Sequence, residues 1–223
     1  MRLTGALIFG LGGAAILIWL GLWQVQRLEW KQGVLAAMAA RLGAAPAPLP
    51  AAPDPSDNYR AVTVGCGFEA RELFVLTSRR GQGPGYRLIV PCSTPNGRRV
   101  MVDLGFLPQS QKDAARAYGG GRVTGNLHWP DEIDPWFTPD PDLDAGIWFA
   151  RDVPAMARVL ETDPVLVVAR QTVGGPPGVT PWPVDTAGIP NNHRQYAITW
   201  FSMAVLWLGM TAFLVWRITR RTG

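Results

Sequence analysis

The sequence is poor in the residues that carry enzyme chemistry. Its 223 residues include only two histidines, His128 and His193, and two cysteines. It has no GxSxG or HExxH motif, no phosphate-binding glycine loop, and no Cys/His cluster with metal-binding spacing. We therefore expect a protein that is not an enzyme.

Charged residues are missing from one long stretch near each end of the chain. None lies between Arg2 and Arg27, and none lies between Arg194 and Arg217. At the rise of a helix, each gap spans roughly 30–35 Å, the thickness of a bilayer's hydrocarbon core. Tryptophans, which favour the headgroup level, cluster at the ends of these stretches: Trp19, Trp23, Trp200 and Trp216. We predict transmembrane helices at 3–26 and 194–216. The first is too long for a cleaved signal peptide.

The charge balance predicts how these helices are oriented. The chain has 21 basic and 17 acidic residues, and four arginines but no acids lie on the extreme ends: Arg2, Arg217, Arg220 and Arg221. By the positive-inside rule both termini, including a tail at 217–223, are cytoplasmic and the neutral middle is exported. No mitochondrial transit sequence precedes the first anchor, which favours a bacterial inner membrane with a periplasmic central domain. The basic pI is thus a topology signal, and we expect no nucleic-acid partner.

The part between the anchors has two sections. Residues 27–58 predict an amphipathic helix, with Leu28, Leu35, Met38 and Leu42 on one face, followed by an Ala/Pro linker at 44–57. Residues 59–190 predict a β-rich exported domain, either α+β or a small barrel, because the strand spacing favours an antiparallel sheet or a small barrel over repeated βαβ units. The predicted strands are Tyr59–Phe68, Glu72–Thr77, Tyr86–Cys92, Arg99–Leu104, Arg122–Trp129 and Asp163–Arg170. Short helices are expected within Pro108–Tyr118 and from an Asp152 N-cap to Leu160.

Two features of this domain leave alternatives open. Cys66 and Cys92 do not form CxxC, and they fit either a disulfide in an oxidising compartment or two buried free thiols. His128 reads as an exposed or hydrogen-bonded histidine. The acidic run within 130–144 reads as a solvated loop, because its spacing does not fit a calcium loop.

His193 stands out because it lies immediately before the second predicted helix. Capping explains the preceding Asn191 and Asn192 but not an imidazole at the membrane edge. Such an imidazole can ligate haem iron or form an interfacial hydrogen bond, and the spacing does not decide between them. His193, Tyr196 and Trp200 share one helical face, so a flat aromatic ligand held by His193 can stack on Trp200.

The first helix reaches the same membrane edge. Trp23, Gln24 and Arg27 are therefore expected to approach the start of the second helix. Arg27 and Arg194 can pair with the propionates of a porphyrin there. The alternative for each arginine is a side chain that snorkels to the interface.

Several segments, in this order between two anchors, resemble the Surfeit locus assembly proteins of cytochrome c oxidase. Gly21–Lys31 is similar to the family's LGxWQxxRxxWK segment, and Asn191–Phe201 to its NNHxQYAxTWF block. Weaker similarities lie at Gly85–Pro91, Val100–Pro108, Phe137–Pro139 and Trp148–Asp152. The sequence departs from the family's Asn-Arg-Gly-Trp-Val-Pro pattern at Asp103, Leu104 and Phe106.

The resemblance implies a non-enzymatic assembly factor for haem-copper cytochrome c oxidase. Such a protein binds haem a as transient cargo, with His193 as the iron ligand, and assists its insertion into subunit I. It implies contacts with subunit I, haem A synthase, other assembly factors and membrane lipid. The alternative is a scaffold without haem that stabilises a subunit I intermediate. A membrane enzyme acting on haem or quinone, or a copper chaperone, is less favoured by the residues present.

Overall fold

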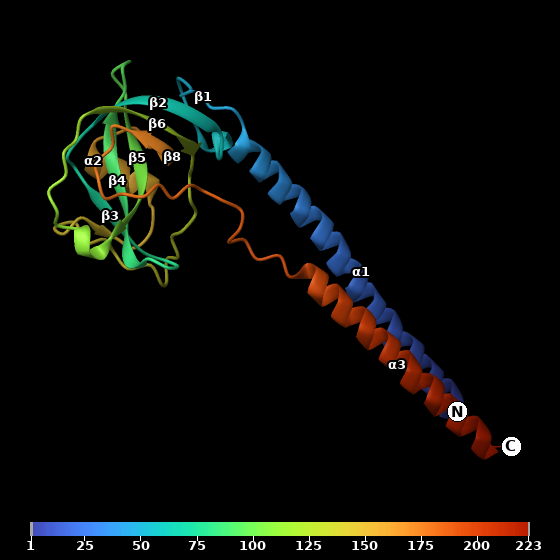
Figure 1. Ribbon diagram of the computed structural model, residues 1–223. Helices are drawn as coiled ribbons and strands as arrows, with labels where there is room; N and C mark the ends of the chain where they lie inside the picture. Colours follow the sequence, from blue (N-terminus) through green and yellow to red (C-terminus); the bar gives the residue numbers. More distant parts are fainter. Residues whose placement is uncertain (1, 223) are drawn as a thin grey trace. The chain divides into compact units, whose positions relative to one another are not determined.

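The computed structural model describes residues 2–222, and their side chains from residue 3 to residue 220 (Figure 1). The chain divides into two units. The helical unit comprises Met1–Ala37 and Thr186–Gly223, and the barrel unit comprises Met38–Asp185. Arg2 and Arg221, which contribute to the predicted charge bias, have side chains outside the described part.

Two long helices carry the apolar stretches. Helix α1 spans Arg2–Gly43 and helix α3 spans His193–Thr222, and both are long and apolar enough to cross a membrane. Helix α1 continues without a break through the segment predicted to be amphipathic. There Leu28, Leu35 and Leu42 are half-buried while most of their neighbours are exposed, as their spacing predicts.

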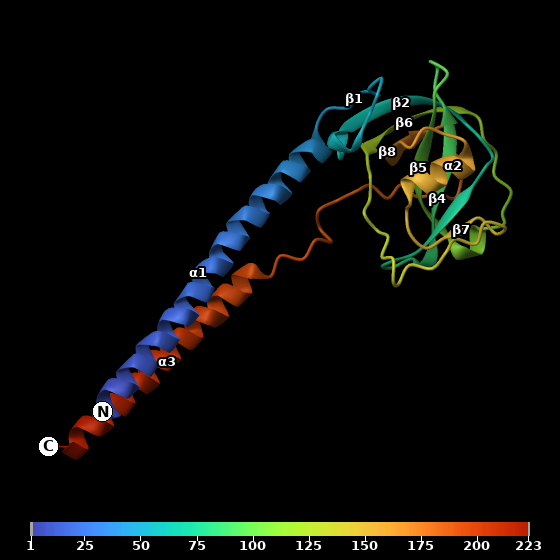
Figure 2. The ribbon, with the colours of Figure 1, turned by 180° about the vertical axis from the view of Figure 1, so that it is seen from behind.

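The two helices of the helical unit pack antiparallel and side by side (Figures 1 and 2). Glycines on α1 make room for large side chains on α3. A Cβ on Gly13 would lie 2.5 Å from Trp207 Nε1, and one on Gly21 would lie 2.6 Å from the Phe201 ring. Trp207 Nε1 also donates to the carbonyl of Gly10 at 2.9 Å. Small residues that admit a close backbone approach are the usual basis of helix packing in membranes.

The barrel unit is built on a closed barrel of five strands. Around the barrel these are β2 (Ala61–Phe68), β6 (Gly120–Leu127), β8 (Leu166–Val173), β5 (Arg99–Pro108) and β4 (Gly83–Ser93). The pairs Gly67–Ser93 and Phe68–Cys92 close it between β2 and β4. Three further strands extend the sheet: β3 (Leu73–Arg79) on β4, β1 (Ala47–Pro48) on β2 and β7 (Ile147–Trp148) on β3.

The closed barrel confirms the small-barrel alternative of the sequence analysis, and its sheet is mixed rather than wholly antiparallel. Strand β8 lies between β6 and β5, antiparallel to the first and parallel to the second. A strand inserted between two antiparallel strands must run parallel to one of them. The local sequence of β8 cannot reveal this, because the neighbours are set by the path of the whole chain.

Alternating side chains fill the core of the barrel, and a disulfide links two of its strands. Val62, Val64, Cys66 and Phe68 of β2 all point into the core, as a period of two residues requires. Cys66 and Cys92 form a disulfide with a Cα–Cα distance of 5.1 Å. The bond links β2 to β4 where the barrel closes, so the question left open by the sequence is resolved in favour of the disulfide.

The short helices agree with the sequence-based prediction only in part. Helix α2 (Val153–Leu160) begins where predicted, and the Asp152 side chain accepts from Ala155 N at 2.9 Å. The helix expected within Pro108–Tyr118 is reduced to one 3-10 turn, η2 (Gln109–Gln111). Arg116 donates to the carbonyls of Gln111 and Lys112, which takes up acceptors that a longer helix would need. In the linker, a second 3-10 turn, η1, covers Pro55–Asp57.

Candidate functional site

The candidate site centres on the first residue of α3. His193 Nδ1 lies 2.7 Å from Gln24 Oε1 of α1. An amide oxygen can only accept a hydrogen bond, so Nδ1 carries the proton. In this tautomer Nε2 keeps its lone pair, and it is the nitrogen that can bind a metal. The structure therefore brings together two residues that the sequence places in the site, and it leaves the proton off Nε2 of His193.

The start of α3 is stabilised by backbone groups rather than by the predicted side-chain caps. The carbonyl of Asn192 accepts from Tyr196 N at 3.2 Å. Asn191 Oδ1 is buried and makes no hydrogen bond within the described part of the chain, so this side chain does not cap the helix. His193 thus begins a helix that is preceded by a buried polar atom without a partner among the described residues.

Aromatic side chains surround this end of the helix pair. Trp200 is half-buried, and its Nε1 is a buried donor without an acceptor among the described residues. Tyr196 and Trp23 are exposed, with 55% and 44% of their surfaces accessible in the helical unit. Tyr196 and Trp200 follow His193 by about one and two helical turns on the same face of α3, so flat rings extend along the helix from His193.

The two predicted arginines are exposed at the same end of the helices. Arg27 lies over the ring of Trp30 on its own helix, with 4.5 Å from Cζ to the ring centroid. Arg194 is exposed one residue after His193. The cation–π contact of Arg27 is a local partner that the sequence analysis did not foresee.

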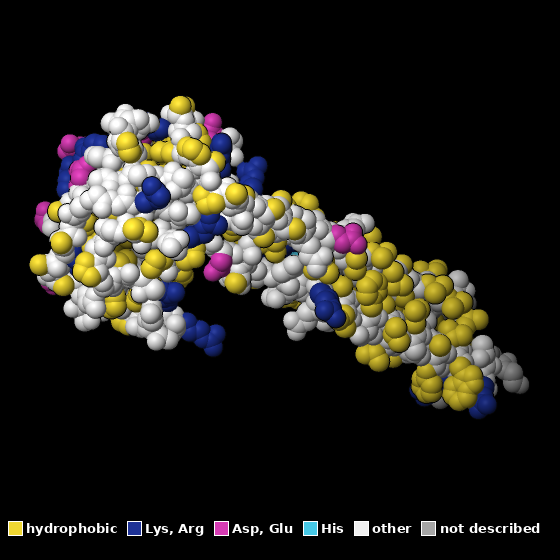
Figure 3. All heavy atoms as spheres, turned by 45° about the horizontal axis from the view of Figure 1, so that its top comes forward, with side chains coloured by type: hydrophobic (Ala, Val, Ile, Leu, Met, Phe, Trp, Pro, Cys, Tyr) yellow, Lys and Arg dark blue, Asp and Glu magenta, His cyan; other side chains and the backbone are white. Residues whose placement is uncertain are grey.

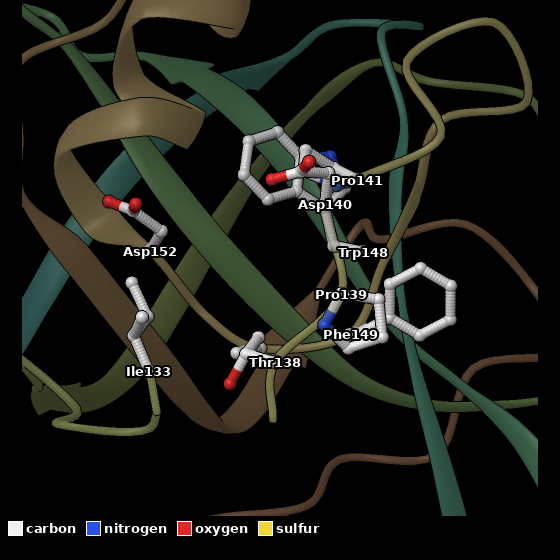
Figure 4. Close-up of a pocket in the computed structure, with 9 residues that line it drawn as sticks. Ile133, Thr138, Pro139, Asp140, Pro141, Trp148, Phe149 and Asp152 are labelled. Atoms are coloured by element: carbon white, nitrogen blue, oxygen red, sulfur yellow. The ribbon is translucent and has the colours of Figure 1, made fainter. Parts of the chain in front are cut away.

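The barrel unit contains a second candidate place, a pocket of about 120 Å³ (Figure 4). Trp148 and Phe149 line it and point in different directions, and Asp140 and Asp152 contribute carboxylates. The loop that forms its wall exposes Trp136 and Phe137 with 88% and 83% of their surfaces accessible. The sequence analysis treated this loop as simply solvated. Two neighbouring aromatic residues between acids could have indicated a contact surface.

A buried ion-pair network fixes this loop to the barrel. Asp103 on β5 is fully buried and accepts from Arg87 Nε at 2.6 Å and from Gly105 N at 3.0 Å. Arg151 lies 3.5 Å from Asp103 and also pairs with Glu132. Burial alone would raise the pKa of Glu132, but the hydrogen bonds and charge of Arg151 hold it below the ordinary value.

The other histidine lies beside this network. His128 Nδ1 is 3.1 Å from Asn58 Oδ1, which agrees with the hydrogen-bonded reading of the sequence. Burial, reinforced by the charge of Arg151, lowers the pKa of His128 to about 4. It is therefore neutral at physiological pH and part of the structural core.

Comparison with known proteins places the chain in one family. The model described as the SURF1 family matches residues 11–205. Surfeit locus protein 1 of Rattus norvegicus is 30% identical over 91% of this chain and 72% of that protein, and that of Gallus gallus is 31% identical over 89% and 70%. A SURF1-like protein of Rickettsia felis is 28% identical over 85% of this chain and 88% of its own length. The match covers the helices that bear His193 and Gln24 as well as the barrel, and the chain belongs to the SURF1 family.

Proposed function

We propose that this protein is an assembly factor for haem-copper cytochrome c oxidase that binds haem a and assists its insertion into subunit I. It acts without catalysing a reaction. The observation that carries the proposal is the hydrogen bond between His193 Nδ1 and Gln24 Oε1, which leaves Nε2 available as an iron ligand. Its place at the start of a membrane-length helix supports a lipophilic cargo.

The chemistry of the donor set suits a haem better than a bare metal ion. Within residues 2–222, no three His, Cys, Asp or Glu side chains converge to hold a metal. A porphyrin supplies four nitrogens to its own iron, so a single imidazole is a sufficient protein ligand. One protein bond is also easily exchanged, which suits a group that is carried and then handed on.

The neighbouring side chains fit the other parts of a porphyrin. Trp200, Tyr196 and Trp23 offer flat surfaces for the ring. Arg27 and Arg194 are exposed guanidiniums of the kind that pairs with propionates. The buried Trp200 Nε1 lacks an acceptor in the described structure, and an oxygen of the ligand would satisfy it.

The charge distribution supports a definite topology for this role. Arginines at both termini and a central part of balanced charge favour cytoplasmic ends and a periplasmic barrel in a bacterial inner membrane. His193 then lies at the periplasmic edge of the bilayer. Subunit I, haem A synthase and other assembly factors are the partners that this placement suits.

The test is an absorption spectrum of the protein purified from cells that make haem A. The wild type should show a haem a band, and His193→Ala should lose or shift it. Gln195→Ala is the matched control, because Gln195 is exposed on the same turn of α3, and its band should be unchanged. A wild type without the band, or a His193→Ala variant with an unaltered band, would refute haem ligation by His193.

A scaffold role is the second candidate, favoured by the pocket and the exposed Trp136 and Phe137 of the barrel unit. It predicts that Trp136→Ser together with Phe137→Ser lowers the yield of assembled oxidase while the haem a band persists. A normal oxidase yield in that variant would exclude this surface as the contact.

A further inference from the structure

The helical unit has an apolar groove between α1 and α3 that the ligand site does not use. Its volume is about 430 Å³, and the residues that line it include Gly13, Ile16, Leu17, Met203, Leu206 and Trp207. Hydrophobic side chains, yellow in Figure 3, gather along this unit. The groove lies further along the helix pair than His193, toward the N-terminus of α1 and the C-terminus of α3.

The groove continues the candidate haem site in register. Ile16 and Leu17 lie seven positions before Trp23 and Gln24 on α1. Met203 and Trp207 lie seven positions after Tyr196 and Trp200 on α3. Seven residues are close to two helical turns, so each groove residue faces the same way as its counterpart, about 10 Å further along the helix. Both helices therefore extend one face from the ring site into the groove.

The polar group of the groove is already bonded within the protein. Trp207 Nε1 donates to the carbonyl of Gly10, and the absence of a side chain at Gly13 lets the indole pack against α1. The remaining lining is aliphatic or thioether. Such a groove offers no hydrogen bond to an occupant and fits a flexible hydrocarbon chain, to whose shape methionine adapts well.

From this continuity we infer that the groove binds the isoprenoid tail of haem a. The inference rests on the proposed function and adds a subsite to it. Haem a differs from haem b by a long hydroxyethylfarnesyl substituent. A tail attached to a ring at His193 is held near the groove, and that tethering raises its effective concentration over free lipid chains. The groove thus makes the site selective for a haem that carries the tail.

The test compares haem a with haem b in spectrophotometric titrations of the full chain in nanodiscs. The wild type should bind haem a about tenfold more tightly than haem b, a packing effect of the size that one good contact surface gives. Leu206→Trp, which fills the groove, should reduce haem a affinity to that of haem b and leave haem b unchanged. Val205→Trp is the control, because Val205 is exposed on α3 and does not line the groove.

The possible outcomes separate this inference from the proposed function. Equal affinities of the wild type for the two haems, or an equal loss of both in Leu206→Trp, would overturn the tail subsite while leaving His193 as the ligand. An effect of Val205→Trp as large as that of Leu206→Trp would do the same and would indicate a lipid or a partner helix on this face. Failure of the wild type to bind either haem would overturn the proposed function itself.

Discussion

Different interactions stabilise the helical unit and the barrel unit. In the barrel, a buried ion-pair network places Arg87, Arg151 and the amide of Gly105 around Asp103, and a disulfide closes the barrel. In the helical unit, glycines on α1 pack against large side chains on α3, and among the described residues two hydrogen bonds join the two helices.

This difference shows where function is to be sought. A polar network in the barrel is what a water-exposed domain needs to fix its loops and its core. His193 and Gln24 form a polar pair where two long apolar helices meet, and hydrogen bonds between these helices are few among the described residues. His193 and Gln24 therefore stand out in the helical unit, whereas His128 and Asp103 do not in the barrel.

The largest effect is expected from removing the buried carboxylate of the barrel. Asp103→Ala leaves Arg87 and Arg151 facing a buried space without their acceptor, and should lower the free energy of unfolding by about 3–5 kcal/mol. Denaturant titration of the barrel transition measures this. Asp57→Ala, which breaks an exposed pair with Arg60, should cost less than about 1 kcal/mol. Equal effects of the two would remove the distinction between buried and exposed pairs.

Loss of the disulfide should destabilise the barrel nearly as much as Asp103→Ala does. The bond closes a loop with a sequence separation of 26 residues, so Cys66→Ser with Cys92→Ser should lower the free energy of unfolding by about 2–4 kcal/mol. The same titration, with and without reductant, gives the value. The haem a band should be unchanged, and a changed band would contradict the placement of the whole ligand site in the helical unit.

Acid should weaken the barrel through His128. Its folded pKa of about 4 lies below the ordinary histidine pKa of 6.5, so the unfolded chain binds the proton more readily. Stability is then complete above pH 6.5 and falls as the pH drops toward 4, by up to about 3 kcal/mol. Unfolding measured across that range should show the slope, and His128→Gln should flatten it. An unchanged slope in the variant would assign the effect to another group.

The smallest effect is expected from a single packing change between the helices. Gly13→Ile drives a side chain into Trp207 and should weaken the packing of α1 on α3 by about 1–3 kcal/mol. The midpoint temperature of thermal unfolding in detergent and the haem occupancy should both fall. Gly12→Ile is the matched control, since a Cβ there meets nothing within 4 Å. A control as damaging as the variant would show that glycine itself, not the contact, is needed.

Local signals in the sequence were enough to predict most of the helices and strands. The uncharged stretches predict the helices, alternation predicts the strands, and Asp152 marks the start of α2. The parallel pairing of β8 and the closure of the barrel depend on contacts between distant segments, which no local pattern contains. The same limit applies to the network of Asp103, although a lone charge in the apolar run Val100–Leu107 was a usable signal of a buried pair.

Helix geometry allowed the sequence to predict which residues of the site lie near one another, but not the contacts they make. Placing both helices at one membrane edge brings Gln24 near His193, but the hydrogen bond and the resulting tautomer need the actual packing. The contact of Arg27 with Trp30 depends on a side-chain conformation that the sequence does not specify. The groove at Gly13 required knowledge of which faces of α1 and α3 meet.

The most direct test of the central claim is chemical rescue of a ligand deletion. His193→Gly, purified from cells making haem A, should lack the haem a band, and imidazole added together with haem a should restore it by filling the vacated space beside Gln24, whereas haem a added alone should not. Restoration would show that an imidazole at this place binds the iron. A band that is present without imidazole, or a band that imidazole fails to restore while the variant remains folded, would contradict the assignment of His193 as the ligand.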